Sequence, residues 1–302
     1  MINPDYLKKG DKVAIISPAG KIDKNKINNA VKILSGWGLD VITGKNSAKA
    51  YNQFAGTDKE RISDFQQMLD DENIKAIFSS RGGYGSIRII EKLNFDNFKK
   101  NPKWIIGFSD ITVFHVYINN NLNIETIHGA MPKKFPDHPN ENRSLTSLKS
   151  MLFGNEINYK IKDHKLNITG KTEGILTGGN LSILYSLNGT KYNIDTKDKI
   201  LFIEDLSEYL YHIDRIMMNF KLSGKFDNLK GLIVGDFTDI KDNNTKFGKT
   251  VYEIIYEHIA EYKIPVCFGF PAGHNDINMA MKFGSKIKFT VNSVGVDITH
   301  TT

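Results

Sequence analysis

The chain has 302 residues, of which 40% are hydrophobic and 25% are charged, a composition typical of a soluble globular protein with one large domain or two ordinary ones. The formal net charge is +6, but lysine and arginine are spread along the chain with no basic run that interleaves with aromatic residues, so we expect no nucleic-acid partner. The single cysteine, Cys267, excludes an internal disulfide and a cysteine-based zinc site.

The N-terminal segment reaches aspartate and lysine within a few residues and has no apolar signal core. No later segment approaches the roughly 20 apolar residues that are needed to span a bilayer. We therefore expect a cytoplasmic protein with no membrane partner.

Strand and helix patterns alternate through the first half of the chain. Apolar runs bounded by turn residues predict strands, and apolar residues at helical spacing predict helices. The predicted strands are 12–18, 39–43, 74–80, 104–108 and 124–128, and the predicted helices are 24–38, 57–71, 85–93 and 110–121. This alternation predicts parallel βαβ units, hence a doubly wound sheet whose ligand crevice lies at the carboxyl ends of the strands.

The pattern breaks at 133–144, which is rich in proline, asparagine and charge. We therefore predict an N-terminal domain over 1–135, a linker region over 136–168 with one helix near 144–154, and a C-terminal domain over 169–302. The second domain has strand patterns at 172–180, 198–206, 229–237, 264–271 and 286–292, and helix patterns at 208–222 and 249–262. It is predicted to be a smaller α/β domain with a larger share of strand.

Ser109 stands between a predicted buried strand and a predicted helix. Serine is a favoured N-cap, because its hydroxyl accepts from the first turn of a helix. A serine in a strand–turn–helix elbow is instead a typical nucleophile. Residues 107–111 carry the first glycine of G-x-S-x-G and lack the second. The residues alone leave both interpretations open.

A glycine-rich turn, 79–90, follows another predicted strand and precedes a helix. Its backbone N–H groups should point into the same crevice as Ser109. Neither phosphate-binding pattern, G-x-x-x-x-G-K-[ST] or G-x-G-x-x-G, fits this segment. Stabilisation of an oxyanion therefore suits it better than phosphate binding, with a plain tight turn as the alternative.

A serine nucleophile needs a base and a group that orients the base. Among the eight histidines, His274 is the best candidate, because it follows a predicted strand in a turn bracketed by glycine and proline. Glu204 and Asp205 end the strand pattern 198–206, where a carboxylate needs a partner such as an imidazole N–H. A plain loop histidine and a helix-capping carboxylate are the alternatives. His128 closes a strand at the crevice and is a candidate substrate contact.

Taken together, these segments resemble the LD-carboxypeptidase family of serine peptidases, which includes muramoyltetrapeptide carboxypeptidases and microcin C immunity peptidases. The landmarks occur in the family's order and extend over nearly the whole chain. They are ISPAG (16–20), FAGTDKER (54–61), SRGGYGS (80–86), IIGFSDIT (105–112), HGAMP (128–132), LTGGNLS (176–182), FIEDLSE (202–208) with IDR (213–215), and GFPAGH (269–274).

The resemblance implies a Ser–Glu–His triad of Ser109, Glu204 and His274. It also implies an oxyanion hole formed by the backbone N–H groups of Gly83 and Asp110. The expected substrate contacts within the matching motifs are Tyr84, His128, Asn180 and Arg215. The implied fold is a flavodoxin-like doubly wound domain plus a β-rich C-terminal domain, with the site between them. The family is commonly dimeric, and its mechanism needs no metal or cofactor.

The implied reaction is hydrolysis of the L,D-amide bond before the terminal D-alanine of murein tetrapeptide. The alternative within the family is the microcin C immunity branch, which cleaves an aminoacyl-adenylate and carries a nucleobase-stacking tryptophan on an extended loop. The comparable stretch here, 160–174, is short and has no aromatic residue, which favours the murein substrate. Leu210 and His212 replace the family's usual proline and arginine. A non-catalytic flavodoxin-like binding protein, with Ser109 as a helix cap, is the second alternative.

Overall fold

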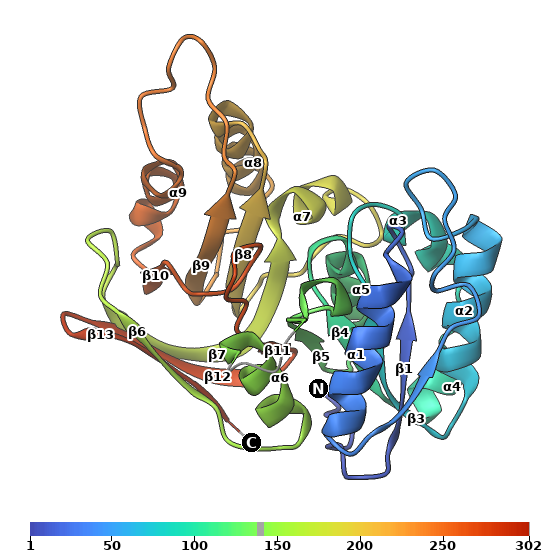
Figure 1. Ribbon diagram of the computed structural model, residues 1–302. Coiled ribbons are helices and arrows are strands. Elements are labelled where there is room, and N and C mark those ends of the chain that lie inside the picture. The colour runs from blue at the N-terminus through green and yellow to red at the C-terminus, as the bar shows by residue number, and fades with distance from the viewer. Residues whose placement is uncertain (138–141, 302) are drawn as a thin grey trace. The chain divides into compact units, whose positions relative to one another are not determined.

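The computed structural model describes residues 1–137 and 142–301, and the chain forms two compact units (Figure 1). The first unit contains Met1–Asn155 and Met279–Lys282, and the second contains Glu156–Asn278 and Phe283–Thr302. Residues 138–141, which belong to the predicted boundary segment, lie outside the described residues.

The first unit is built on a six-stranded sheet with the order β11-β5-β4-β3-β1-β2. Strands β1 to β5 pair in parallel, and β2-β1-β3-β4-β5 is the flavodoxin-like order, so the predicted doubly wound sheet is confirmed. Most side chains of β1, β3, β4 and β5 are buried, which explains why these strands read as continuous apolar runs, whereas the edge strand β2 has no fully buried residue. The strands are β1 (Lys12–Ile16), β2 (Asp40–Thr43), β3 (Ile74–Ser79), β4 (Trp104–Gly107), β5 (Thr126–His128) and β11 (Met281–Phe283).

The helices of the first unit are mostly short. A capping box between Thr57 and Glu60 starts one of the two long ones, α2. The predicted helix 85–93 consists of a short α-helix followed by a 3-10 turn, and the predicted helix 110–121 starts as a 3-10 turn and ends in a π-turn. The α-helices are α1 (Lys24–Gly36), α2 (Asp58–Asp70), α3 (Ser86–Ile89), α4 (Asp96–Lys100), α5 (Thr112–Tyr117) and α6 (Arg143–Leu152).

The second unit is built on a seven-stranded mixed sheet with the order β10-β9-β8-β7-β12-β13-β6. Strands β10, β9, β8 and β7 are parallel, and the remaining pairs are antiparallel. The strands are β6 (Asn158–Lys162), β7 (Gly170–Asn180), β8 (Lys199–Leu206), β9 (Gly231–Thr238), β10 (Val266–Phe268), β12 (Lys286–Asn292) and β13 (Gly295–His300). The predicted β-rich α/β character is thereby confirmed.

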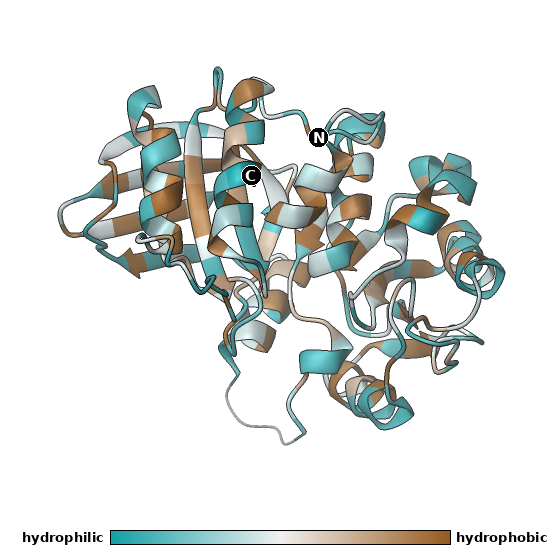
Figure 2. Ribbon diagram, turned by 90° about the horizontal axis from the view of Figure 1, so that it is seen from above, coloured by the Kyte–Doolittle hydropathy of each residue, from teal (hydrophilic) through white to brown (hydrophobic). Residues whose placement is uncertain are grey.

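Three α-helices accompany this sheet within the described residues: α7 (Leu181–Leu187), α8 (Leu210–Leu222) and α9 (Val251–Ile259). Figure 2 shows hydrophobic residues along the strands and hydrophilic residues on parts of the helices. Among the described residues, none of the helices combines the length and the apolar character that a bilayer crossing requires.

Candidate active site

Ser109 lies at the carboxyl end of β4, where the chain leaves the buried sheet. Phe108 is extended, and Ser109 itself has a φ of +64°, in the left-handed region that few non-glycine residues occupy. An N-cap residue has an extended backbone, so this conformation is not that of a cap. Backbone strain of about 1–3 kcal/mol is typically kept where function needs it. The turn fits a nucleophile elbow.

The glycine-rich loop after β3 packs against the Ser109 turn at Gly82. A Cβ added to Gly82 would lie 2.9 Å from the Cβ of Ser109, 3.0 Å from its Oγ and 3.2 Å from the backbone N of Asp110. Only glycine therefore leaves room beside the hydroxyl and the adjacent N–H. The sequence places Gly82 in the predicted glycine-rich turn, but nothing in the sequence separates it from the neighbouring glycines.

Gly83 is the predicted first oxyanion donor. The carbonyl of Gly82 accepts a hydrogen bond of 3.0 Å from the N–H of Gly20. Because a trans peptide is planar, the N–H of Gly83 points in the opposite direction, away from Gly20. Gly83 has a φ of +102°, which favours glycine at this position. Its N–H orientation is compatible with donation to a bound ligand.

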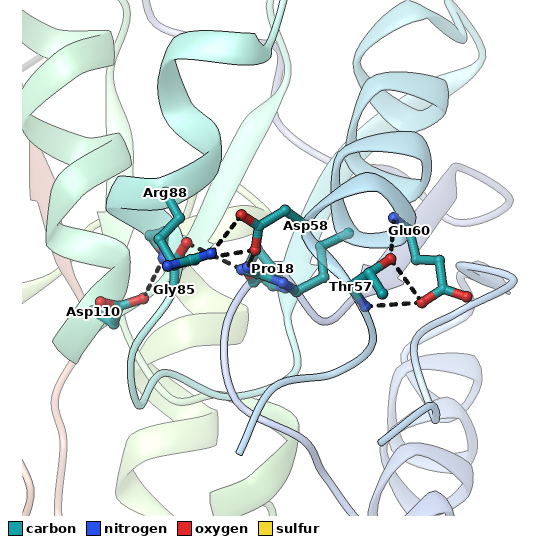
Figure 3. A network of polar contacts seen from close by, with 9 residues as sticks. Pro18, Thr57, Asp58, Glu60, Gly85, Arg88 and Asp110 are labelled. Atoms are coloured by element: carbon teal, nitrogen blue, oxygen red, sulfur yellow. Dashed lines mark hydrogen bonds and ion pairs between the residues drawn. The ribbon is translucent and has the colours of Figure 1, made fainter. Parts of the chain in front are cut away.

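Asp110, whose N–H is the predicted second donor, ties the two loops together through its side chain. The buried carboxylate accepts a 2.8 Å hydrogen bond from the N–H of Ser86, at the end of the glycine-rich loop (Figure 3). Burial raises the pKa of Asp110, and the hydrogen bonds from Ser86 oppose that shift. The Asp110 side chain thus fixes the nucleophile turn relative to the glycine-rich loop.

The buried guanidinium of Arg61 holds the same end of the glycine-rich loop, at Gly85. Arg61, on α2, donates to the carbonyl oxygens of Pro18 and Gly85, and the second of these bonds measures 3.0 Å. Asp58 pairs with Arg61 and also with Arg88, whose Nε and Nη2 lie 3.1 and 2.9 Å from its two oxygens. One side chain therefore joins the loop after β1 to the loop after β3.

Glu204 and His274 form a hydrogen-bonded pair in the second unit. Glu204 is fully buried on β8, and its Oε2 lies 2.7 Å from Nδ1 of His274. A carboxylate on Nδ1 fixes the tautomer in which Nδ1 carries the proton and Nε2 is the proton acceptor. This is the arrangement that a serine hydrolase requires of its general base.

The loop that carries His274 passes close to two carboxyl groups. Gly273 has a φ of +141°, and a Cβ there would lie 3.1 Å from Oε2 of Glu204 and 3.1 Å from Cβ of Asp236. Burial raises the pKa of Asp236 to about 6, and the charge of Glu204 contributes to the shift. Asp236 is thus a second ionisable carboxyl beside the Glu204–His274 pair, and sequence reasoning missed it.

Asp205 has a different role from its neighbour Glu204. It accepts hydrogen bonds from Nδ2 of Asn180 at 2.9 Å and from the N–H of Ser182 at 2.8 Å. Oδ1 of Asn180 in turn accepts from the N–H of Ile183, so Asn180 caps α7. Burial, with a contribution from Glu204, raises the pKa of Asp205 to about 7. The amide of Asn180 is thus engaged in local structure, and its contact with substrate stays a prediction.

The other predicted substrate contacts lie in different surroundings. The Tyr84 ring is 46% exposed and lies 5.9 Å from the Phe54 ring. His128 is buried, with its ring 5.7 Å from that of Phe108. Arg215 is exposed on α8 and lies over a tyrosine ring.

The predicted site residues divide between the two units. The first unit carries Gly83, Tyr84, Ser109, Asp110 and His128, and the second carries Asn180, Glu204, Arg215 and His274. Within the described ranges, no group of three or more histidine, cysteine, aspartate or glutamate side chains is arranged to hold a metal ion.

Comparisons with known proteins cover both units. Models of the LD-carboxypeptidase N-terminal and C-terminal domains match residues 13–129 and 173–289. A probable murein peptide carboxypeptidase of Bacillus subtilis (strain 168) is 35% identical over 289 residues, 94% of this chain and 90% of that protein. The microcin C7 self-immunity protein of Escherichia coli is 27% identical, covering 96% and 93%.

The structure of muramoyltetrapeptide carboxypeptidase from Oxalobacter formigenes matches with a TM-score of 0.88 at 25% identity, covering 96% of this chain and 99% of that one. The match of both domain models, together with a relative 35% identical over nearly the whole chain, shows the family. The chain belongs to the LD-carboxypeptidase family.

Proposed function

We propose that this protein is a serine carboxypeptidase that hydrolyses the L,D-amide bond before the terminal D-alanine of murein tetrapeptide. The names of the relatives from Bacillus subtilis and Oxalobacter formigenes support this substrate class. The observation that carries the proposal is the buried Glu204 carboxylate, 2.7 Å from Nδ1 of His274. The left-handed backbone of Ser109 supports its role as the nucleophile.

In the proposed mechanism, Nε2 of His274 removes the proton of the Ser109 hydroxyl while Glu204 stabilises the resulting imidazolium. Oγ of Ser109 attacks the carbonyl carbon, and the N–H groups of Gly83 and Asp110 stabilise the oxyanion. His274 then protonates the nitrogen of D-alanine as the amide bond breaks. A water molecule hydrolyses the acyl-enzyme by the same route. Each oxyanion donor contributes about 100- to 1,000-fold in rate.

We also propose that the substrate is the tetrapeptide, either free or linked to a muropeptide. The reaction drawn above uses no metal and no organic cofactor. We propose a cytoplasmic homodimer with no nucleic-acid or membrane partner. Light scattering on the purified protein tests the dimer, and fractionation of cells tests the location. A monomer, or a membrane-bound fraction, would contradict these two points.

The test of the reaction is mass-spectrometric. The protein and the Ser109→Ala variant are each incubated with murein tetrapeptide, murein pentapeptide and an aminoacyl sulfamoyl-adenylate. We expect loss of one alanine from the tetrapeptide only, with the rate reduced on the order of 10⁴-fold or more in the variant. Ser186→Ala, which removes an exposed hydroxyl from α7, serves as the matched control and should leave the rate unchanged.

The other outcomes separate the alternatives. Cleavage of the adenylate analogue in place of the tetrapeptide would assign the protein to the microcin immunity branch. Three intact substrates would favour a non-catalytic binding protein. Equal tetrapeptide cleavage by the protein and by Ser109→Ala would show that another residue is the nucleophile.

A further inference from the structure

Two basic residues stand on loops that flank the Ser109 turn. In the sheet of the first unit, β4 lies between β3 and β5, so the loops that leave the carboxyl ends of these three strands are neighbours (Figure 1). Arg81 follows β3, and Lys133 lies in the 3-10 turn Pro132–Lys134 that follows β5. The N–H of Lys133 donates a 2.9 Å hydrogen bond to the carbonyl of Ser80, which joins the two loops.

Arg81 places its guanidinium next to the predicted oxyanion loop. Its Nη1 donates to the carbonyl of Lys21 at 2.8 Å, and its Nη2 lies 3.7 Å from the position that a Cβ of Gly83 would occupy. Its Nε is buried and has no hydrogen-bond partner among the described residues. Within the described part of the chain, the Arg81 guanidinium therefore bonds to a backbone carbonyl and pairs with no carboxylate.

Lys133 is the second cation of the pair. Partial burial lowers the pKa of its ammonium, and the positive charges of Arg81 and Lys134 add to the effect. Within residues 1–137 and 142–301, Lys133 forms no ion pair. Asp137, four residues later in the sequence, forms an ion pair with Lys26, with 2.7 Å between Oδ1 and Nζ. The charge of Arg81 thus disfavours the charge of Lys133, and a bound anion would relieve this repulsion.

We propose that Arg81 and Lys133 bind the terminal carboxylate of the peptide substrate. The assignment rests on the proposed function, because a peptidase that removes one C-terminal residue must recognise the carboxylate next to the scissile bond. The guanidinium offers a planar fork that matches a carboxylate, and the ammonium adds a point charge. Both residues are on loops that leave the strands on either side of β4, whose own loop carries the nucleophile, and the terminal carboxylate lies one residue from the attacked carbonyl.

The experiment compares two tetrapeptides that differ only at the C-terminus, one with the free carboxylate and one with a carboxamide. We expect the protein to prefer the free acid by about 100-fold in kcat/KM, since a hydrogen bond to a charged group contributes about tenfold or more. Arg81→Met and Lys133→Met should each lose about 10- to 100-fold on the acid, mainly through KM. On the carboxamide they should stay within about threefold of the parent protein.

Lys100→Met is the matched control, because it removes the same charge from an exposed position at the end of α4, before β4. Lys100→Met should leave kcat/KM unchanged on both the acid and the carboxamide. If Arg81→Met does not fold, Arg81→Lys keeps the charge without the fork and should show a partial loss on the acid alone. Thermal melts of each variant show whether it is folded.

Three results would count against the proposal in different ways. Equal rates on acid and carboxamide in the parent protein would show that no carboxylate site exists. Equal losses on both substrates in the variants would show that Arg81 and Lys133 support the fold instead. If the parent protein cleaves neither peptide, the proposed function itself is wrong, and the carboxylate assignment is overturned with it.

Discussion

At the residue scale, Gly82 controls access to the Ser109 hydroxyl, and its replacement by alanine is a purely steric test. Gly82 does not have a positive φ, so alanine fits its backbone. The new methyl group would lie 2.9 to 3.2 Å from the Cβ and Oγ of Ser109 and from the N of Asp110. We expect Gly82→Ala to lower kcat about 100-fold or more, because one lost oxyanion donor already costs that much.

The control for this substitution is Gly36→Ala, at the C-terminal end of α1. A Cβ at Gly36 meets no atom within 4 Å, and alanine is the better helix former by about 1 kcal/mol. Steady-state kinetics should show an unchanged kcat for Gly36→Ala, and a thermal melt should show that Gly82→Ala remains folded. A Gly82→Ala protein with parental kcat would mean that the space beside Ser109 is not used by the substrate.

Some site residues could be predicted from the sequence and others could not, for a physical reason. Ser109 and His274 stand out because each lies in the turn that follows an apolar strand pattern, and the end of a buried strand is where a polar side chain reaches the crevice. Glu204 and Asp205 look equivalent in the sequence. In the structure Glu204 bonds to His274 and Asp205 bonds to Asn180. Successive strand residues point to opposite faces, and the face is set by contacts distant in sequence.

At the element scale, Arg61 joins two loops that are far apart in sequence. It is buried, it bonds to the carbonyls of Pro18 and Gly85, and it pairs with Asp58. Arg61→Met would leave two carbonyls and a carboxylate without this donor. We expect the free energy of unfolding to fall by about 3 kcal/mol or more, because two carbonyl oxygens each lose a hydrogen bond to a charged group that contributes about 1.5–3 kcal/mol. Chemical denaturation measures the change.

Arg88→Met is the matched control, because Arg88 pairs with the same Asp58 from an exposed position. The expected loss is much smaller than that of Arg61→Met, because solvent screens an exposed ion pair. Since Arg61 holds the glycine-rich loop, Arg61→Met should also lower kcat in conditions where the protein is folded. Equal destabilisation by the two substitutions would contradict the role of Arg61 in joining the two loops.

The elements that the sequence predicted best are the buried parallel strands of the first unit. Their apolar runs are continuous because both faces are covered, so their ends are sharp in the sequence. The short helix α4 and the edge strand β6 were not predicted. A five-residue helix is too short to show a helical period, and the NYKIK segment of β6 is largely polar and exposed. The domain limits 1–135 and 169–302 stay a prediction.

At the scale of the whole molecule, a late segment of the chain completes the first unit. Met279–Lys282 belongs to the unit formed by Met1–Asn155, and β11 continues its sheet beside β5. The Nζ of Lys282 lies 3.4 Å from Oε2 of the buried Glu125 and donates to Oδ1 of Asn3 at 3.0 Å. The fold of the first unit therefore depends on residues that are translated after most of the second unit.

This dependence predicts that Lys282→Met destabilises the first unit. Burial raises the pKa of Glu125, and Lys282 opposes that shift, so the substitution leaves a buried carboxyl group without its cation. We expect a loss of about 3–5 kcal/mol in the free energy of unfolding. The only two tryptophans, Trp37 and Trp104, lie in the first unit, so tryptophan fluorescence during urea denaturation reports on it selectively.

The double variant Glu125→Gln/Lys282→Met separates loss of the ion pair from loss of packing. If the unpaired carboxyl group is the cause, the double variant should be more stable than Lys282→Met alone, because the group that lost its partner is then neutral. Lys286→Met breaks an exposed pair with Glu173 in the second unit and should leave the fluorescence midpoint unchanged. If Lys282→Met does not change the urea midpoint of the tryptophan fluorescence, the first unit does not need this ion pair to fold. Residues 279–282 would then contact a unit that is already stable without them.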